Sequence, residues 1–236
     1  MRNKLLISGI LILLGLKLSG LQAQTVKDIE GNVYKTVKIG TQEWMAENLK
    51  TTKYNDGTAI ATDHTDEQWS KLTTGAYTIY DHSRITGLNS DDEVFEVYGA
   101  LYNWYAFETG NLCPTGWKVP ADSEWTALTD YIGEAAGGIL KSTRTSPDVH
   151  PRWESPNNAT DEYGFSALPG GYRISNGSFT NFGYSGHWWS SSGDDSRLLT
   201  TFAWYRSMIF NNNSVNRYSN FKQFGFSVRC VRDIIP

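Results

Sequence analysis

The residues best suited to bind a ligand are aromatic and arginine side chains in the carboxyl-terminal half of the chain. They lie after Lys141, in a stretch rich in serine, asparagine and glycine. Flat aromatic rings suit the C–H faces of sugars, and arginine can hydrogen-bond hydroxyl groups. We therefore expect ligand contacts from Trp153, Tyr172, Arg173, Tyr184, Trp188, Trp189, Trp204 and Arg206. The alternative is structural: a Trp-Trp-Ser-Ser sequence is typical of a strand with one indole in the core, and both arginines can pair with surface acids.

The loop at residues 154–161 carries the oxygen-bearing side chains that a calcium site needs. Asn157, Asn158 and Asp161 offer hard oxygen ligands close together in the sequence, as Ca²⁺ requires. The same residue types also form turns, because their short side chains hydrogen-bond the nearby backbone. Calcium binding and a structural turn both remain open for this loop.

Catalytic chemistry finds little support in the spacing of the reactive side chains. The four histidines are scattered, and no two of them have the spacing of a metal-binding helix. No nucleophile-elbow or phosphate-loop sequence occurs. The acidic residues between 61 and 97 are typical of a solvated surface rather than of a paired-carboxylate site. We therefore expect no enzyme activity and, apart from calcium, no cofactor.

Cys113 and Cys230 are the only cysteines, so a single intramolecular disulfide is possible. In the chain-entropy model, closing a loop of about 100 residues stabilises a fold by up to about 4.7 kcal/mol. Metal binding by the two cysteines is the weaker alternative, because no histidine lies near either one in the sequence. We expect the disulfide to join the middle of the chain to its last strand.

Residues 1–23 are typical of a secretory signal peptide. Arg2 and Lys4 precede an apolar run at residues 5–16, and Ala23 is a small residue suited to the position before cleavage. A retained membrane anchor is the alternative, but this run is shorter than the roughly 20 residues that span a bilayer. The predicted mature chain, residues 24–236, has a length typical of one domain.

Export changes both the charge and the redox environment that we expect. Removing three basic residues and no acidic residue changes the net charge from −4 to −7. Nucleic acid is not expected as a partner, because binding phosphates requires a basic surface. Oxidising conditions outside the cell permit a disulfide. We expect a secreted or cell-surface protein whose mature part does not insert into a membrane.

Short aromatic runs separated by glycine, asparagine and serine predict an α+β fold. Residues 28–40 alternate around a Glu-Gly-Asn turn and predict a hairpin. Helical spacing of apolar residues predicts a helix at residues 97–107, and a shorter helix is expected at residues 66–72. Short strands are expected at residues 165–168, 171–174, 178–182, 186–191, 198–205, 214–218 and 225–231.

A further helix is expected to begin at Asp122 or Ser123, either of which can cap it. Its inward face would carry Trp125, Leu128 and Ile132, and it would end at Gly133 or at the glycine pair 137–138.

Six ordered motifs make the chain resemble a known family, the Fibrobacter succinogenes major paralogous domain. These motifs are residues 28–40, 44–52, 98–106, 113–120, 164–173 and 225–231. More distantly, the Cys-Pro-x-Gly-Trp and Gly-Phe-x-x-Arg-Cys-Val segments are similar to the C-type-lectin-like fold, with the formylglycine-generating, sulfatase-modifying branch nearest in pattern. The resemblance implies two helices, a twisted antiparallel sheet, long irregular loops and a disulfide between the helix side and the terminal strand.

The resemblance also bears on activity. Formylglycine-generating enzymes use redox-active cysteines, whereas Cys113 and Cys230 match the positions of the structural bridge. We therefore expect a secreted, non-catalytic module that presents a loop surface to an extracellular glycan or protein, for adhesion or surface recognition. An enzyme of the formylglycine-generating type or a hydrolase is one alternative, and a structural subunit of a surface assembly is another.

Overall fold

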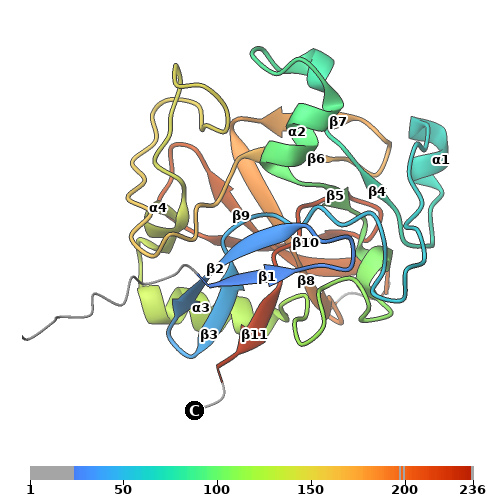
Figure 1. Ribbon diagram of the computed structural model, residues 1–236, viewed down its shortest axis with the longest axis horizontal. Helices are drawn as coiled ribbons and strands as arrows, with labels where there is room; N and C mark the ends of the chain where they lie inside the picture. Colours follow the sequence, from blue (N-terminus) through green and yellow to red (C-terminus); the bar gives the residue numbers. More distant parts are fainter. Residues whose placement is uncertain (1–23, 197, 199, 235–236) are drawn as a thin grey trace, which may run out of the picture.

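The computed structural model describes residues 24–196, 198 and 200–234. The predicted signal peptide at residues 1–23 therefore lies outside the described residues. Within the described part of the chain, no helix has both the length and the apolar character needed to cross a membrane. The molecule combines two larger β-sheets with a few short helices, which confirms the α+β class (Figure 1).

The first sheet joins the two ends of the described chain. It contains β1 (Thr25–Lys27), β2 (Val33–Ile39), β3 (Gln42–Met45) and β11 (Val231–Asp233), in the order β1-β2-β3-β11, with antiparallel neighbours. A hairpin is present around the predicted Glu-Gly-Asn turn, but its first strand, β1, lies before residue 28. The Asp28 carboxylate closes the turn by accepting hydrogen bonds from the Asn32 backbone and side chain. The buried side of β2 carries Tyr34, while Val33 is exposed.

The second sheet forms the centre of the fold. Its five strands follow the order β10-β9-β8-β6-β7, and only the β6–β8 pair is parallel. The strands are β6 (Gly170–Arg173), β7 (Phe179–Phe182), β8 (Ser185–Gly193), β9 (Phe202–Ile209) and β10 (Asn216–Phe221). A small two-stranded sheet, β4 (Tyr77–Thr78) with β5 (Leu101–Tyr102), is linked to it through residues 225–227, which form bridges to β5, β6 and β8.

Both faces of the central sheet are buried along the first six residues of β8. Successive side chains of a strand point to opposite faces, so Trp188 and Trp189 enter different parts of the core. Trp188 belongs to a cluster with Trp44 and Trp125, and Trp189 belongs to another cluster with Phe226. Neither indole is therefore left at the surface.

The helices are α1 (Asp66–Ser70), α2 (Asp91–Tyr98), α3 (Asp122–Ile132) and α4 (Ala136–Leu140). The predicted helix at residues 97–107 is wrong. Gly99, with φ of +75°, ends α2, and the chain then forms β5 and a 3₁₀ turn, η2 (Trp104–Phe107). The helix lies earlier because Ser90 caps it, accepting a hydrogen bond from the Glu93 backbone.

The predicted helix after residue 122 is confirmed as α3, which ends before Gly133. Its N-terminal cap position is Ala121 rather than Asp122 or Ser123, and Glu124 accepts a hydrogen bond from the Ala121 backbone. Trp125 and Leu128 are buried, as expected, while Ile132 is only partly buried. The predicted disulfide is present between Cys113 and Cys230.

Candidate functional site

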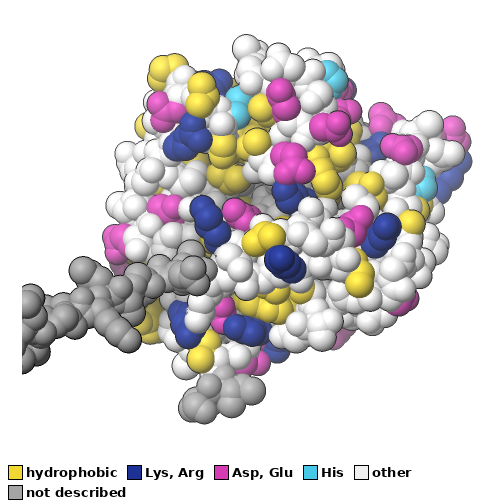
Figure 2. All heavy atoms as spheres, in the orientation of Figure 1, with side chains coloured by type: hydrophobic (Ala, Val, Ile, Leu, Met, Phe, Trp, Pro, Cys, Tyr) yellow, Lys and Arg dark blue, Asp and Glu magenta, His cyan; other side chains and the backbone are white. Residues whose placement is uncertain are grey.

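An open groove of about 590 Å³ lies between three segments that are distant in the sequence. One wall is formed around η1 (His82–Arg84), the second by the loop after α4, and the third by β7 and the turn that follows it. The lining residues are Tyr80, Arg84, Ile85, Thr86, His150, Arg152, Glu154, Phe179, Thr180, Asn181, Phe182 and Tyr184. In Figure 2, hydrophobic side chains gather in the upper half of this face, between the loop after α4 and helix α2.

A larger hollow of about 670 Å³ lies beside Trp117, and its charged residues other than the exposed Lys38 are paired. Arg232 pairs with the buried Glu43 at 2.6 Å. Lys118 pairs with Glu124 at 2.7 Å and with Asp233 at 3.4 Å. We treat the groove as the candidate functional site, because it places one charge of each sign that is unpaired among the described residues, Arg152 and Glu154, beside aromatic rings.

Aromatic side chains form the floor of the groove and one of its walls. The Phe182 ring contacts Tyr80 at 5.0 Å and Tyr98 at 4.6 Å between centroids, which holds it against the core. Tyr184 follows on the same side, and half of its surface is exposed (51 %). Such a combination of fixed and exposed rings is suited to packing against an apolar ligand face.

The second wall is held in place by a buried tryptophan. Trp153 has no exposed surface, and its indole N–H donates to the Ala167 carbonyl at 3.0 Å. The ammonium group of Lys141 lies 5.2 Å from the ring centroid. The two flanking residues, Arg152 and Glu154, line the groove. The Arg-Trp-Glu sequence could have indicated this arrangement. In an extended segment, a buried aromatic residue between two charged residues places both charged side chains on the opposite, outer side.

His150 has partners for both of its ring nitrogens. Nδ1 lies 2.7 Å from the Tyr98 hydroxyl, and Nε2 lies 3.1 Å from the Thr86 carbonyl. A carbonyl only accepts, so we assign the proton to Nε2, and Nδ1 then accepts from Tyr98. Burial lowers the pKa of His150, which favours this neutral form.

Arg152 and Glu154 retain hydrogen-bonding capacity. Arg152 Nη1 donates to the Asp148 carbonyl at 2.9 Å, but its buried Nε has no partner among the described residues. Over the same part of the chain, neither Arg152 nor Glu154 forms an ion pair. The groove thus offers a free donor and a free acceptor beside aromatic rings.

Comparison with protein families identifies the scaffold that carries this groove. Residues 37–232 match the Fibrobacter succinogenes major domain. The chain belongs to this family. The comparison with curated proteins and the comparison with solved structures each returned no match.

Three motifs that carry the resemblance to the major domain family meet at one buried arginine. Arg229 donates to the Asn48 side chain at 3.0 Å and to the Ser166 carbonyl at 2.8 Å, and it also contacts the Phe165 carbonyl. Burial lowers the pKa of Arg229 to about 9. These motifs therefore build the scaffold, while the residues that line the groove lie between motifs.

The structure corrects the prediction for three tryptophans of this family member. Trp153, Trp188 and Trp189 have no exposed surface and cannot contact a ligand at the surface. Their indole N–H groups donate to protein acceptors, Trp188 to Asn48 at 2.9 Å and Trp189 to the Tyr102 carbonyl at 2.8 Å. The alternative interpretation, a strand with one tryptophan of the pair in the core, was closer, but both Trp188 and Trp189 are buried.

The predicted ligand contacts at Arg173 and Arg206 are also wrong, since both side chains are buried and paired. Arg173 binds Asp66 at 3.0 Å and Arg206 binds Asp122 at 2.5 Å. Burial lowers the pKa of each guanidinium, and the carboxylate partner opposes this shift. The alternative for these two arginines, pairing with acidic residues, is confirmed.

Of the predicted aromatic residues, Tyr184 is in the groove and two others lie elsewhere on the central sheet. Tyr172 is half-buried and packs on His187 at 4.4 Å between centroids. Trp204 is half-buried under Arg217, whose guanidinium carbon lies 3.4 Å from the ring centroid. The structure does not bring these two residues together with Tyr184.

In the loop predicted to bind calcium, Asp161 and Asn157 form hydrogen bonds to residues outside the loop. The Asp161 carboxylate accepts from the Ser166 backbone at 2.7 Å and from its hydroxyl at 2.5 Å. The Asn157 amide nitrogen donates to the Ser142 carbonyl at 3.0 Å, its buried Oδ1 has no partner among the described residues, and Asn158 is exposed. At Asp161 this is the arrangement that the structural-turn alternative predicts, while calcium binding by the loop stays a prediction.

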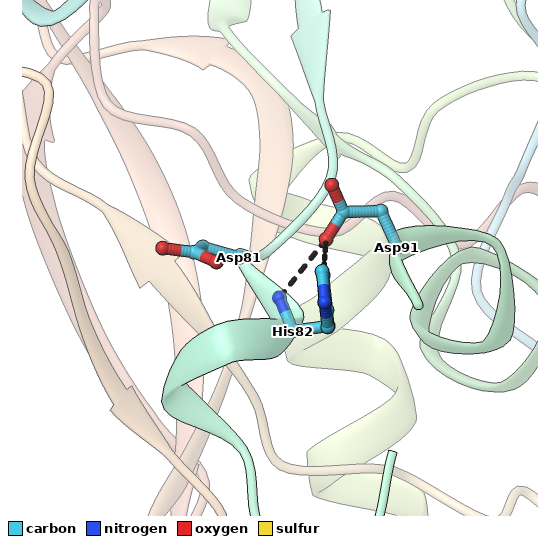
Figure 3. Close-up of side chains that lie close together, drawn as sticks. All are labelled: Asp81, His82 and Asp91. Atoms are coloured by element: carbon cyan, nitrogen blue, oxygen red, sulfur yellow. Dashed lines mark hydrogen bonds and ion pairs between the residues drawn. The ribbon is translucent and has the colours of Figure 1, made fainter. Parts of the chain in front are cut away.

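A different group, Asp81, His82 and Asp91, brings potential metal ligands within 4.8 Å of one another beside the groove. Figure 3 shows Asp91 against His82, whose backbone and ring nitrogens approach one Asp91 oxygen at 2.9 and 2.7 Å. Asp81 caps η1 by accepting from the Ser83 backbone at 2.9 Å. Sequence reasoning missed this group because its members come from separate elements. Its oxygens accept hydrogen bonds from the chain itself, which gives them a structural role.

Proposed function

We propose that this member of the major domain family is an exported, non-catalytic binding module whose groove holds an extracellular glycan. The observation that carries the proposal is the groove itself, which combines an exposed tyrosine and fixed phenylalanine rings with unpaired Arg152 and Glu154. Apolar walls with a few polar groups of this kind are typical of small-ligand sites.

A binding role is favoured over a formylglycine-generating activity by the state of the cysteines. Both are joined in one disulfide, so neither offers a thiol for redox chemistry. The disulfide also supports export, because such bonds persist in oxidising compartments. It agrees with the signal peptide predicted at residues 1–23, and we propose a secreted or cell-surface location.

We propose a C-type-lectin-like architecture for the fold. The support is the central, mainly antiparallel sheet, the helices α2 and α3, the long segment 141–169 without helix or strand, and the pairing of β11 with β3 near the start of the chain. Such a scaffold leaves loops free to form a binding surface.

The proposal predicts that Tyr184→Ala abolishes most glycan binding. Affinity electrophoresis of the mature chain against a panel of soluble polysaccharides would identify a ligand, and titration calorimetry would measure it. We expect affinity to fall by about tenfold, since losing an exposed aromatic contact is worth about 1.4 kcal/mol.

Tyr131→Ala is the matched control, because Tyr131 is also an exposed tyrosine (60 %) but lies on α3, away from the groove. It should bind as the wild type does. Equal affinity of the Tyr184→Ala variant and the wild type for every ligand found would reject the groove as the glycan site.

A further inference from the structure

We propose that the groove recognises two adjacent hydroxyl groups on a neutral sugar ring, with Glu154 accepting a hydrogen bond from one and Arg152 donating to the other. This inference rests on the proposed function and names the ligand chemistry of the same site. It assigns a role to two residues that form no ion pair within the described chain.

The backbone places the two side chains together. Residues two apart in an extended segment point to the same side, while the residue between them points to the other. Trp153 is fully buried and hydrogen-bonded to the Ala167 carbonyl, so its neighbours Arg152 and Glu154 both face the groove. A fixed spacing of this kind suits a fixed pair of hydroxyl groups.

Arg152 is partly ordered before any ligand arrives. Nη1 is held by the Asp148 carbonyl at 2.9 Å, and the backbone N–H donates to the Tyr98 hydroxyl at 3.1 Å. The buried Nε has no acceptor among the described residues, which is unfavourable for a polar atom. Nη2 is not buried in this way and has no partner among the described residues, so it is the nitrogen that can donate to a ligand oxygen.

Glu154 lies beside the exposed tyrosine. Its backbone N–H donates to the Gly183 carbonyl at 2.9 Å, and its side chain lies so close to Gly183 that a Cβ there would be 3.3 Å from Glu154 Cγ. Gly183 precedes Tyr184 and has φ of +79°, which a glycine adopts without strain. A sugar ring packed on Tyr184 would therefore have its hydroxyl groups near the Glu154 carboxylate.

The charges of the groove favour a neutral ligand. His150 has a lowered pKa and both nitrogens occupied, and Arg84 pairs with Asp81 at 3.3 Å. Among the described residues that line the groove, the unpaired charges that remain are one guanidinium and one carboxylate. A uronic acid would be attracted by Arg152 but repelled by Glu154, and an amino sugar the reverse, so neither gains net charge attraction. A hydroxyl pair satisfies both residues as charge-assisted hydrogen bonds.

Two linear glucans test this inference. Internal residues of a 1,4-linked glucan carry adjacent free hydroxyls at carbons 2 and 3, whereas those of a 1,3-linked glucan have no adjacent free pair. We expect the mature chain to bind the 1,4-linked polymer at least about tenfold more tightly, the equivalent of one charge-assisted hydrogen bond. Periodate oxidation, which cleaves the bond between adjacent hydroxyl-bearing carbons, should remove this binding.

Glu154→Gln and Arg152→Gln should each weaken binding to the 1,4-linked polymer by about tenfold or more and leave the melting temperature unchanged. Arg144→Gln is the matched control, since Arg144 is exposed on the same loop but does not line the groove. Equal binding of the 1,3-linked or oxidised polymer, or tighter binding of a uronic-acid polymer, would overturn the inference. If Tyr184→Ala still abolished that binding, the glycan-binding function would stand. Absence of binding to any glycan would reject both.

Discussion

His187 is surrounded by aromatic rings inside the central sheet. Its ring lies 4.4 Å from Tyr172 and 5.2 Å from Phe226 between centroids. Nε2 lies 2.8 Å from the Ser185 hydroxyl, and the buried Nδ1 has no partner among the described residues. Burial lowers the pKa of His187 to about 3, so the imidazole is neutral in the folded protein at neutral pH.

The lowered pKa of His187 predicts acid destabilisation. In the unfolded chain a histidine takes up its proton near pH 6.5, whereas in the folded chain His187 does so near pH 3. The unfolded state therefore binds more protons between these values, and the free energy of unfolding falls by up to about 1.4 kcal/mol per pH unit as pH decreases from 6.5.

Urea unfolding of wild type and His187→Gln at pH 7 and pH 5 would measure this effect. The variant should show a smaller loss between the two pH values than the wild type. His82→Gln, at a partly exposed histidine outside the core, serves as control and should retain most of the wild-type loss. An identical pH dependence in His187→Gln would contradict the prediction.

At the scale of elements, helix α3 is fastened to the central sheet through its first residue. The Asp122 carboxylate accepts from Arg206 of β9 at 2.5 Å and from Arg217 of β10 at 2.9 Å. Burial opposes ionisation of Asp122, but the hydrogen bonds from Arg217 and Arg206 outweigh it and lower its pKa. A negative charge at this end of the helix also suits the helix dipole.

Asp122→Asn should lower the free energy of unfolding by about 3 kcal/mol, because the buried Arg206 would lose its carboxylate partner. Asp130→Asn, an exposed substitution on the same helix, should stay within about 0.5 kcal/mol of wild type. Chemical denaturation of the three proteins at pH 7 would measure both values. Equal stability of the two variants would show that the ion pair does not hold the helix.

Helices and strands were predicted correctly where the residues that determine them lie within the same segment. The hairpin and α3 were predicted correctly because turn residues and apolar spacing are contained within each segment. Residues 97–107 have equally good helical spacing of apolar residues, but the Asn103 side chain forms hydrogen bonds with residues distant in the sequence. Its side chain accepts from the Ala76 backbone at 3.0 Å and donates to the Thr74 carbonyl at 2.8 Å. Such tertiary bonds override helix propensity and are invisible in a single segment.

At the scale of the whole molecule, the disulfide joins residues that are 117 positions apart. The double variant Cys113→Ala/Cys230→Ala should lose up to about 5 kcal/mol of stability, because its unfolded chain is no longer cross-linked. Urea unfolding should show this loss. Dithiothreitol should bring the wild type toward the variant and leave the variant unchanged. Two free thiols in unreduced, denatured wild type would contradict the bridge.

The groove was harder to predict than the scaffold, because its three walls come from segments around residues 80, 150 and 180. The sequence identified Tyr184 from its type and its loop context. The prediction that Trp188 and Trp189 contact a ligand was wrong, because both are buried. Where both faces of a strand are covered, the sequence does not distinguish a buried tryptophan from an exposed one. Arg152 and Glu154 could have been inferred only after Trp153 was known to be buried.

Pairing of β11 with β3 brings the end of the described chain into the same sheet as its beginning. In Figure 1 this sheet occupies the lower half of the molecule, whereas the segments that form the groove lie in the upper half. A chip or bead that captures the protein through a carboxyl-terminal tag would therefore hold it by the opposite side. Immobilised in this orientation, every captured molecule would display its groove to polysaccharides flowing past.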